Sequence, residues 1–419
     1  MTYKIAFGIR TTHMSGIYRY GTSLLKSMGP LLPEMGVKLF ALHRPGMRHH
    51  LLEEIGPVNE GIEFVEVADD YGFIRDSAWL RSWLLREEIT MYYSAHYLVD
   101  PDLPVPFIYT IHDLIRIKYP EYSYTDRSFI DKFGIEEFCR MRVALRELME
   151  TVTAYTSCSA GRGVFYNYFL AINHRLKERA RYIVTVSNTV RQDLLELLSI
   201  PAHKITVVSN AVDSEVFFPR PDGDVAQALQ RYGIEGPYCL YVGTGHKHKR
   251  LAWFLENIAS YKDHLPANGK LVLVGSHYNL NPELQTLISA LGLSSFVMFT
   301  GRVSDEELAC LYSGAQALVV SSVDEGFCLP VLEALACKTE VIVPDLPVFH
   351  EVAGSRVNFY PAFDGDALVN AVLHIFSDSL LPKNKDLITR FSWHRSASDL
   401  LQLLLQYNDR ARSETTYRT

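Results

Sequence analysis

Two glutamates and a helix start stand together in the stretch from 321 to 334, directly after an apolar run. Pro330 fits the first turn of a helix, where its missing N–H costs nothing. Free backbone N–H groups and the positive end of the helix dipole suit a phosphate there. Glu325 precedes this helix and Glu333 follows one turn in, where a carboxylate can accept hydrogen bonds from sugar hydroxyls. A lone pair of this kind is otherwise a helix-start charge and a solvated helix-face residue.

A basic run, His246 to Arg250, follows a strand-like stretch that ends near Gly243. Taken alone, such a run is equally typical of a solvated loop and of an anion-binding site. Its position after a strand favours function, because ligands bind outside the carboxyl ends of parallel strands.

The first half of the chain offers two weaker candidates. Gly16 precedes a helical stretch, where it would serve equally well as a turn residue. His112 and Asp113 follow a strand, and a histidine at a strand end can be structural or catalytic. A neighbouring carboxylate such as Asp113 is suited to orienting the ring.

Strands and helices alternate along the chain and position these residues. Apolar periodicity predicts strands at 4–9, 37–42, 62–67, 90–93, 107–111, 182–186, 238–242, 270–274, 297–300, 317–320 and 340–343. Helices are predicted at 17–28, 76–86, 189–198, 251–261, 305–313 and 330–336. The order predicts an α/β fold of two doubly wound parallel sheets with a cleft between two domains.

The predicted domains are 1–208 and 209–392, with a helix at 393–419. A helical, aromatic-rich segment at about 120–181 is longer than a connection needs. We interpret it as a surface for an acceptor, a partner subunit or a membrane.

Composition narrows the class of protein. A length of 419 residues, with 48% hydrophobic and 21% charged residues, is typical of two or three folded domains. The net charge of −7 argues against general binding of nucleic acid. The six cysteines are scattered and show no metal-ligand spacing, which predicts no metal site. Together with the lack of a signal-like apolar stretch, this pattern predicts a cytoplasmic location. No run of about 20 apolar residues is present, so no transmembrane helix is predicted.

The stretch around Glu325 resembles the retaining glycosyltransferases of family 4, which have the GT-B fold of two Rossmann-like domains. Their hallmark is a glutamate, seven residues and a second glutamate, here Glu325 and Glu333. The resemblance implies that Glu325 binds donor-sugar hydroxyls and Glu333 the nucleotide ribose. It also implies that the donor meets the backbone in the run Gly326, Phe327, Cys328 and Leu329, where Cys328 replaces a common glycine.

Further motifs resemble the family in the same order along the chain. Gly243 and Lys249 correspond to the family's strand–glycine turn and its diphosphate-binding lysine, while His248 and Arg250 depart from the usual arginine and asparagine. Whether Arg250 serves as a substitute phosphate ligand is left open. Thr244 stands where some members have a second phosphate-binding arginine.

The same resemblance implies roles for three more residues. It implies that Gly16 lies near the donor, that His112 positions the sugar, and that the backbone at Val303 reads the base. The helix after Phe391 is expected to cross back to the first domain.

The resemblance implies a metal-independent, retaining glycosyltransferase without a cofactor, using a nucleotide-diphosphate sugar such as GDP-mannose or a UDP-sugar. The predicted catalytic residues are His112, Lys249 and Glu325. The expected acceptor is a glycan or a lipid-linked glycan, and peripheral membrane contact and a homodimer are further interpretations of the 120–181 segment. The alternatives are a nucleotide-sugar 2-epimerase of the same fold and a catalytically silent GT-B scaffold.

Overall fold

The computed structural model describes residues 3–9, 16–56, 61–67, 78–97, 99–151, 162–243, 245–275, 281–377 and 390–416. The chain forms two compact units. Unit 1 comprises Met1–Asn210 and Trp393–Thr419, and unit 2 comprises Ala211–Ser392.

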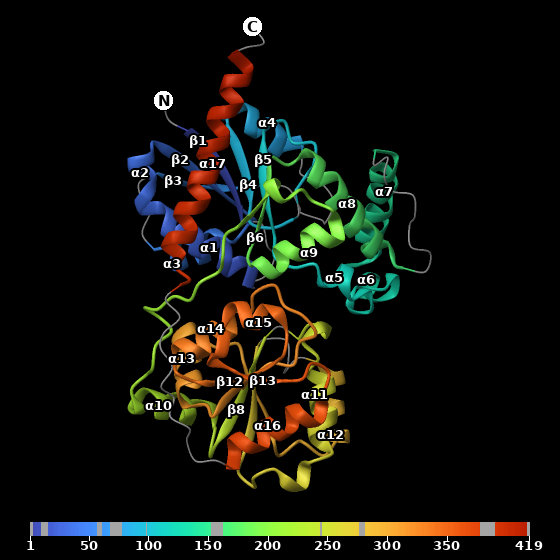
Figure 1. Ribbon diagram of the computed structural model, residues 1–419, viewed down its shortest axis with the longest axis vertical. Helices are drawn as coiled ribbons and strands as arrows, with labels where there is room; N and C mark the ends of the chain where they lie inside the picture. Colours follow the sequence, from blue (N-terminus) through green and yellow to red (C-terminus); the bar gives the residue numbers. More distant parts are fainter. Residues whose placement is uncertain are drawn as a thin grey trace. The chain divides into compact units, whose positions relative to one another are not determined.

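Unit 1 is built on a parallel sheet whose described strands run in the order β3-β2-β1-β4-β5-β6-β7 (Figure 1). The strands are β1 (Tyr3–Ile9), β2 (Val37–His43), β3 (Ile62–Glu66), β4 (Met91–Ser94), β5 (Phe107–Ile111), β6 (Tyr182–Thr185) and β7 (Ile205–Val207). All residues of β4 and β5 are buried, as expected for strands covered on both faces. This explains why these strands read as apolar runs rather than alternating patterns.

The helices of unit 1 follow the strands as the alternation predicts. They are α1 (Gly16–Met28), α2 (Leu32–Met35), α3 (Arg48–Ile55), α4 (Ala78–Arg86), α5 (Ile115–Lys118), α6 (Asp126–Phe133), α7 (Ile135–Thr151), α8 (Val164–Arg179), α9 (Asn188–Leu198) and α17 (Trp393–Thr416). Short 3₁₀ turns lie at Gly29–Leu31, Pro120–Tyr122 and Ala202–Lys204. Ser187 caps α9 by accepting a hydrogen bond from the Val190 amide, which fixes the start of that helix.

Helix α17 belongs to unit 1 although it ends the chain. It packs against α1 and also contacts β4 (Figure 1). The ring of Trp393 lies 6.1 Å from that of Tyr20 in α1, and the Ser396 hydroxyl donates to the Ser209 carbonyl oxygen at 2.7 Å. The predicted return of the chain to the first domain is therefore observed in these contacts.

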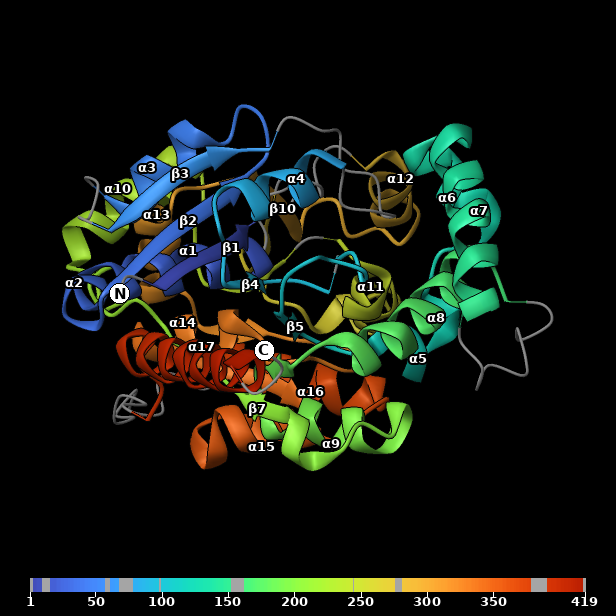
Figure 2. The ribbon, with the colours of Figure 1, turned by 90° about the horizontal axis from the view of Figure 1, so that it is seen from above.

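The aromatic-rich segment forms α6, α7 and α8, with α6 and α7 outside the sheet in both views (Figures 1 and 2). Phe129 of α6 is buried, and its ring lies 5.6 Å from that of Phe165 in α8. The aromatic residues therefore pack this segment onto itself and onto the core of unit 1.

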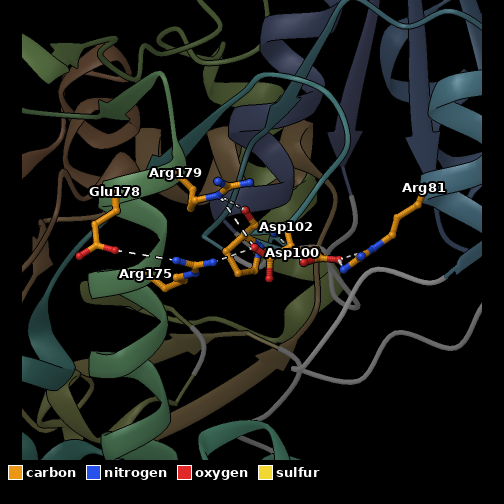
Figure 3. Close-up of polar contacts among 7 residues, drawn as sticks. Arg81, Asp100, Asp102, Arg175, Glu178 and Arg179 are labelled. Atoms are coloured by element: carbon orange, nitrogen blue, oxygen red, sulfur yellow. Dashed lines mark hydrogen bonds and ion pairs between the residues drawn. The ribbon is translucent and has the colours of Figure 1, made fainter. Parts of the chain in front are cut away.

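An ion-pair network fastens α8 and α4 to the loop between β4 and β5 (Figure 3). Asp100, only 2% exposed, accepts from Arg81 of α4, and its second carboxylate oxygen accepts from the Asp102 amide at 2.9 Å. Asp102 in turn pairs with Arg175 of α8 at 3.0 Å and with Arg179 at 3.9 Å. This loop therefore links two helices that are far apart in the sequence.

Unit 2 is a second parallel sheet, with its described strands in the order β10-β9-β8-β11-β12-β13. The strands are β8 (Tyr238–Val242), β9 (Lys270–Val274), β10 (Val297–Gly301), β11 (Ala317–Val319), β12 (Glu340–Pro344) and β13 (Asn358–Tyr360). The helices are α10 (Asp222–Tyr232), α11 (Leu251–Ala259), α12 (Pro282–Ala290), α13 (Asp305–Gly314), α14 (Leu329–Ala336), α15 (Pro347–Val352) and α16 (Gly365–Ser377), with 3₁₀ turns at Lys247–Lys249, Lys262–His264 and Gly354–Arg356.

The predicted α/β class with two doubly wound parallel sheets is confirmed. Two strands escaped prediction, β7 and β13, which each contain three residues and end their sheets. Both are partly exposed and do not read as apolar runs, whereas the equally short β11 is fully buried and was predicted. The helix predicted at 76–86 begins, within the described residues, at Ala78.

Candidate functional site

The strand order of unit 2 brings two of the sequence candidates to one place. Strand β8 pairs with β9 on one side and with β11 on the other, so the sheet changes winding direction between β8 and β11. Ligands of doubly wound sheets bind where the strand order reverses. The loop after β8 carries Lys249, and the loop after β11 carries Glu325.

Lys249 and Glu325 form an ion pair between these two loops. The Lys249 ammonium contacts Oε1 of Glu325, and the side chains are only 17% and 7% exposed. The Ser322 hydroxyl donates to the same carboxylate oxygen at 2.6 Å. A cation so shielded from solvent interacts more strongly with an incoming anion than a surface lysine does. The interpretation of Lys249 as part of a solvated basic loop is therefore wrong.

The start of α14 is shaped for an anion. Cys328 precedes the helix with φ of +69°, in the left-handed region, and its side chain makes no capping hydrogen bond. Pro330 occupies the first turn, as the sequence predicts. Pro330 has no N–H and the Val331 amide donates to the Cys328 carbonyl oxygen at 3.1 Å, so the helix start suits a phosphate mainly through the positive end of its dipole.

The backbone at Cys328 also explains the family's preference for glycine at this position. A left-handed φ strains any residue that carries a Cβ. Burial raises the pKa of the Cys328 thiol, and the nearby Glu325 carboxylate raises it further. The thiol is therefore protonated at neutral pH.

Glu333 is buried on α14 and only 3% exposed. The hydroxyl of Tyr312, on α13, donates to its Oε2 at 3.1 Å. The interpretation of Glu333 as a solvated helix-face residue is therefore wrong, and Glu325, which precedes the helix, is also buried at 7% exposure. Carboxylates are rarely buried without partners, so both are held for a purpose other than solubility.

Arg250 lies on aromatic rings next to the site. Its guanidinium carbon is 3.6 Å from the centroid of Trp253 and 5.0 Å from that of Phe363. Its φ of +57° is left-handed, a conformation that asparagine tolerates better than arginine. The stacking helps to hold Arg250 in a place where the family commonly has asparagine.

Several predicted donor-binding positions are backbone positions. The Gly243 amide, after β8, donates to the Val274 carbonyl oxygen at 3.1 Å. Val303 follows β10 in the loop before α13. Gly326, Phe327 and Leu329 are buried beside Cys328, and the ring of Phe327 packs edge-on to Phe391 at 5.1 Å.

Unit 1 holds the two remaining candidates, Gly16 and His112. A Cβ built at Gly16 would meet none of the described residues within 4 Å, so their packing does not require glycine at the start of α1.

His112 directly follows β5 and has a defined tautomer. Its Nε2 lies 2.7 Å from the Ala95 carbonyl oxygen, which can only accept, so Nε2 carries the proton. Burial lowers the His112 pKa from 6.5 to about 4, although the bond to Ala95 opposes this shift. The ring is therefore neutral at pH 7, with Nδ1 as an acceptor for a hydroxyl group. Asp113 accepts from the Ile115 amide at 3.1 Å instead of bonding Nε2 of His112.

The sequence reasoning missed residues around these candidates. His96 follows β4, and its pKa is well below the usual range because of burial first and of His112 and Arg116 next. Its position at a strand end was the available signal. Tyr241, Ser321 and Ser322 carried no signal, because serine and tyrosine are common in and after strands.

Family comparisons fit this geometry. The family model described as Glycosyltransferase Family 4 matches residues 32–216, and the one described as Glycosyl transferases group 1 matches residues 229–391. The chain belongs to the family 4 glycosyltransferases. Both the Lys249 turn and the Glu325 to Glu333 motif lie inside the second match.

Curated relatives of this family 4 member match over part of their length. The chain is 31% identical to the O-antigen chain mannosyltransferase RfbU of Salmonella typhimurium over 55% of this chain and 58% of the relative. It is 28% identical to the O-antigen chain mannosyltransferase B of Escherichia coli over 49% of this chain and 54% of the relative. The chain thus spans little more than half the length of these relatives.

Solved structures support the GT-B fold over nearly the whole chain. A glycosyltransferase from Rickettsia africae ESF-5 matches with a TM-score of 0.65 and 17% identity, covering 97% of this chain and 98% of that one. HepE of Anabaena, in complex with UDP and glucose, matches with a TM-score of 0.62 and 16% identity over the full length of both chains. At these identities, the likeness shows the fold alone.

Among the residues that the structure describes, no group of three or more His, Cys, Asp or Glu side chains is arranged to hold a metal ion. The described helices include no stretch with the length and apolar character of a membrane span. The described cysteines, Cys139, Cys239, Cys310, Cys328 and Cys337, are free thiols.

Proposed function

We propose that this family 4 member is a glycosyltransferase that moves a hexose from a nucleotide-diphosphate sugar to an acceptor hydroxyl with retention of anomeric configuration. The observation that carries the proposal is the shielded Lys249–Glu325 pair at the reversal of the unit 2 sheet, beside the uncapped start of α14. Family membership supports the reaction class and the retention.

Lys249 and the first turn of α14 would receive the donor diphosphate. As the glycosidic bond lengthens, negative charge grows on the leaving diphosphate and positive charge on the sugar. A preorganised ammonium and the positive end of a helix dipole stabilise the growing negative charge most in the transition state. In the structure, Lys249 is neutralised by Glu325, so the diphosphate would compete with Glu325 for the ammonium.

Glu325 would then turn to the sugar. Its Oε1 contacts Lys249 and Ser322, whereas the described residues place no hydrogen bond on Oε2. The second oxygen is therefore available to accept from a sugar hydroxyl. We assign the nucleotide ribose to Glu333, the base to the backbone at Val303, and a sugar hydroxyl to Nδ1 of His112.

We propose mannose as the first sugar to test. The named relatives are O-antigen mannosyltransferases, which supports this choice. GDP-mannose is the corresponding donor, and UDP-sugars form the comparison set. No cofactor or metal is assigned to the reaction.

We propose a glycan or lipid-linked glycan as acceptor, with the helical segment of unit 1 as its contact or as a peripheral membrane contact. Between α7 and the start of α8 lies a hollow of about 440 Å³ lined by Arg142, Leu145, Arg146, Met149, Glu150 and Val164. Both arginines are exposed and have no ion pair within the described residues. Apolar side chains beside two cations suit an anionic amphiphile.

The donor is tested by thermal unfolding with a panel of nucleotide sugars, followed by product analysis. A donor at 100 times its Kd stabilises the native state by about 2.7 kcal/mol. For a domain the size of unit 2, this shifts Tm by roughly 5–11 °C. GDP-mannose should give such a shift, and the anomeric configuration of the product reports retention. If no nucleotide sugar raises Tm, the proposal is wrong, and donor turnover without any acceptor would indicate epimerisation instead.

A further inference from the structure

The carbonyl oxygen of Lys249 accepts hydrogen bonds from two side-chain hydroxyls. Tyr241 donates to it at 2.5 Å and Ser321 at 2.7 Å, and the two hydroxyl oxygens lie 3.1 Å apart. Tyr241 and Ser321 are only 2% and 1% exposed. Two buried hydroxyls thus converge on one loop carbonyl.

The two donors come from different parts of the sheet. Tyr241 lies in β8, and its ring stacks on that of Phe254 with the two centroids 6.3 Å apart. Ser321 follows β11. A backbone bond from the Val323 amide to the His248 carbonyl oxygen, at 2.9 Å, joins the same two loops. The 3₁₀ turn of Lys247–Lys249 is therefore fastened to the loop that carries Glu325.

Fixing this carbonyl helps to fix the direction in which the Lys249 side chain leaves the backbone, and the pair with Glu325 holds its ammonium end. The carbonyl orientation sets the peptide plane after Lys249, and with it the backbone from which the side chain leaves. On the other side of the pair, the Ser322 hydroxyl holds Oε1 of Glu325. A catalytic group must be held to within about 0.5 Å by surrounding contacts of this kind.

We propose that Tyr241 and Ser321 are positioning residues, which set the Lys249 ammonium for the leaving diphosphate through its main-chain carbonyl. This inference rests on the proposed function, since it assumes that Lys249 binds the diphosphate. It extends that function to two residues that do not themselves touch the substrate.

The chain offers a matched control for removing the tyrosine hydroxyl. Tyr238 lies in the same strand, is buried, and donates to the Leu311 carbonyl oxygen at 2.7 Å. Tyr241→Phe and Tyr238→Phe each remove one buried hydrogen bond to a carbonyl, and both should lower Tm. Only Tyr241→Phe should lower kcat, by about 3–10-fold, with less than a twofold change in KM for the donor. An equal fall in kcat for both variants would overturn the proposal.

A double-mutant cycle separates positioning from general destabilisation. If Tyr241 acts through Lys249, then Tyr241→Phe should cause no further loss of kcat in a Lys249→Ala background. Ser321→Ala should behave in the same way. The same fold-loss in both backgrounds would mean that neither hydroxyl acts through Lys249, and the proposal would be wrong.

A readout without donor keeps this inference distinct from the proposed function. Reductive ¹³C-methylation gives each lysine an NMR signal, and Lys249→Arg identifies the Lys249 signal by its disappearance. Tyr241→Phe and Ser321→Ala should shift that signal, and Tyr238→Phe should leave it in place. If wild-type protein turns over no nucleotide sugar, the proposed function fails. An unmoved Lys249 signal instead refutes the positioning role.

Discussion

Replacing Lys249 by alanine tests the centre of the proposed site. The Lys249 side chain is 17% exposed and its ammonium is paired with Glu325, so its contact with a diphosphate would be charge-assisted and shielded. Such a contact contributes about 1.5–3 kcal/mol. If it acts mainly in the transition state, kcat should fall by about 10–100-fold, with a smaller change in donor KM. Steady-state kinetics with saturating donor measure both constants.

The same substitution has a cost in stability that must be separated from catalysis. Glu325, 7% exposed, loses its cation and, among the described residues, keeps the Ser322 hydroxyl as a hydrogen-bond donor at 2.6 Å. Because Lys249 is partly exposed, we expect the free energy of unfolding to drop by about 1–3 kcal/mol rather than by the full cost of breaking a buried pair. Adding Glu325→Gln removes the unpaired charge and should restore part of the lost Tm without restoring kcat.

Lys247 provides the matched control for Lys249. It lies in the same 3₁₀ turn and is exposed to solvent. Lys247→Ala should therefore change neither kcat nor Tm appreciably. Wild-type kcat and kcat/KM in Lys249→Ala, measured with saturating donor, would refute the assignment of the leaving-group contact.

Three further predictions concern stability and pH. The pKa of His112 is about 4 in the folded chain against 6.5 in the unfolded chain, so the unfolded chain binds more protons between these two pH values. The free energy of unfolding should therefore fall by up to about 3 kcal/mol as the pH drops from 6.5 to 4. In His112→Gln, Tm should depend less steeply on pH over the same range. A pH profile as steep in the variant as in wild type would contradict this. Asp100→Ala leaves Arg81 and the Asp102 amide without their acceptor, so denaturant unfolding should show that the free energy of unfolding falls by about 1–3 kcal/mol. Asp100→Asn keeps an amide oxygen and should lose less stability. Equal losses in the two variants would reject the role of the loop amide. Cys328→Gly relieves the strain of a left-handed backbone but removes a small buried side chain, so its Tm should stay within a few degrees of wild type. The Tm of Cys328→Val should fall clearly. The reverse order of Tm in thermal unfolding would show that backbone strain is unimportant at this position.

The sequence was informative where local chemistry decides structure. Apolar runs separated by helical periodicity predicted strands such as β5 and β8, and Pro330 predicted the start of α14 within about one residue. The motif around Glu325 and Glu333 predicted the family. The short edge strands β7 and β13 escaped because they are partly exposed and form no apolar run, unlike the buried three-residue strand β11.

The candidate site was predictable as a set of residues, but the contacts among them were not. Lys249 and Glu325 are 76 positions apart, and no periodicity shows that one faces the other. Likewise, nothing in the run around His112 indicates that the Ala95 carbonyl, 17 positions away, would fix its tautomer.

By itself, the sequence determined the alternation of strands and helices, the family and the list of polar candidates, since each depends on residues close together in the chain. Only the tertiary structure decided that β8 lies beside β11, although two strands intervene in sequence. That adjacency brings the Lys249 turn to Glu325 and places the Tyr241 and Ser321 hydroxyls on one carbonyl. The physical reason is that strand order is set by how helices cover both faces of the whole sheet, which no local stretch of sequence encodes.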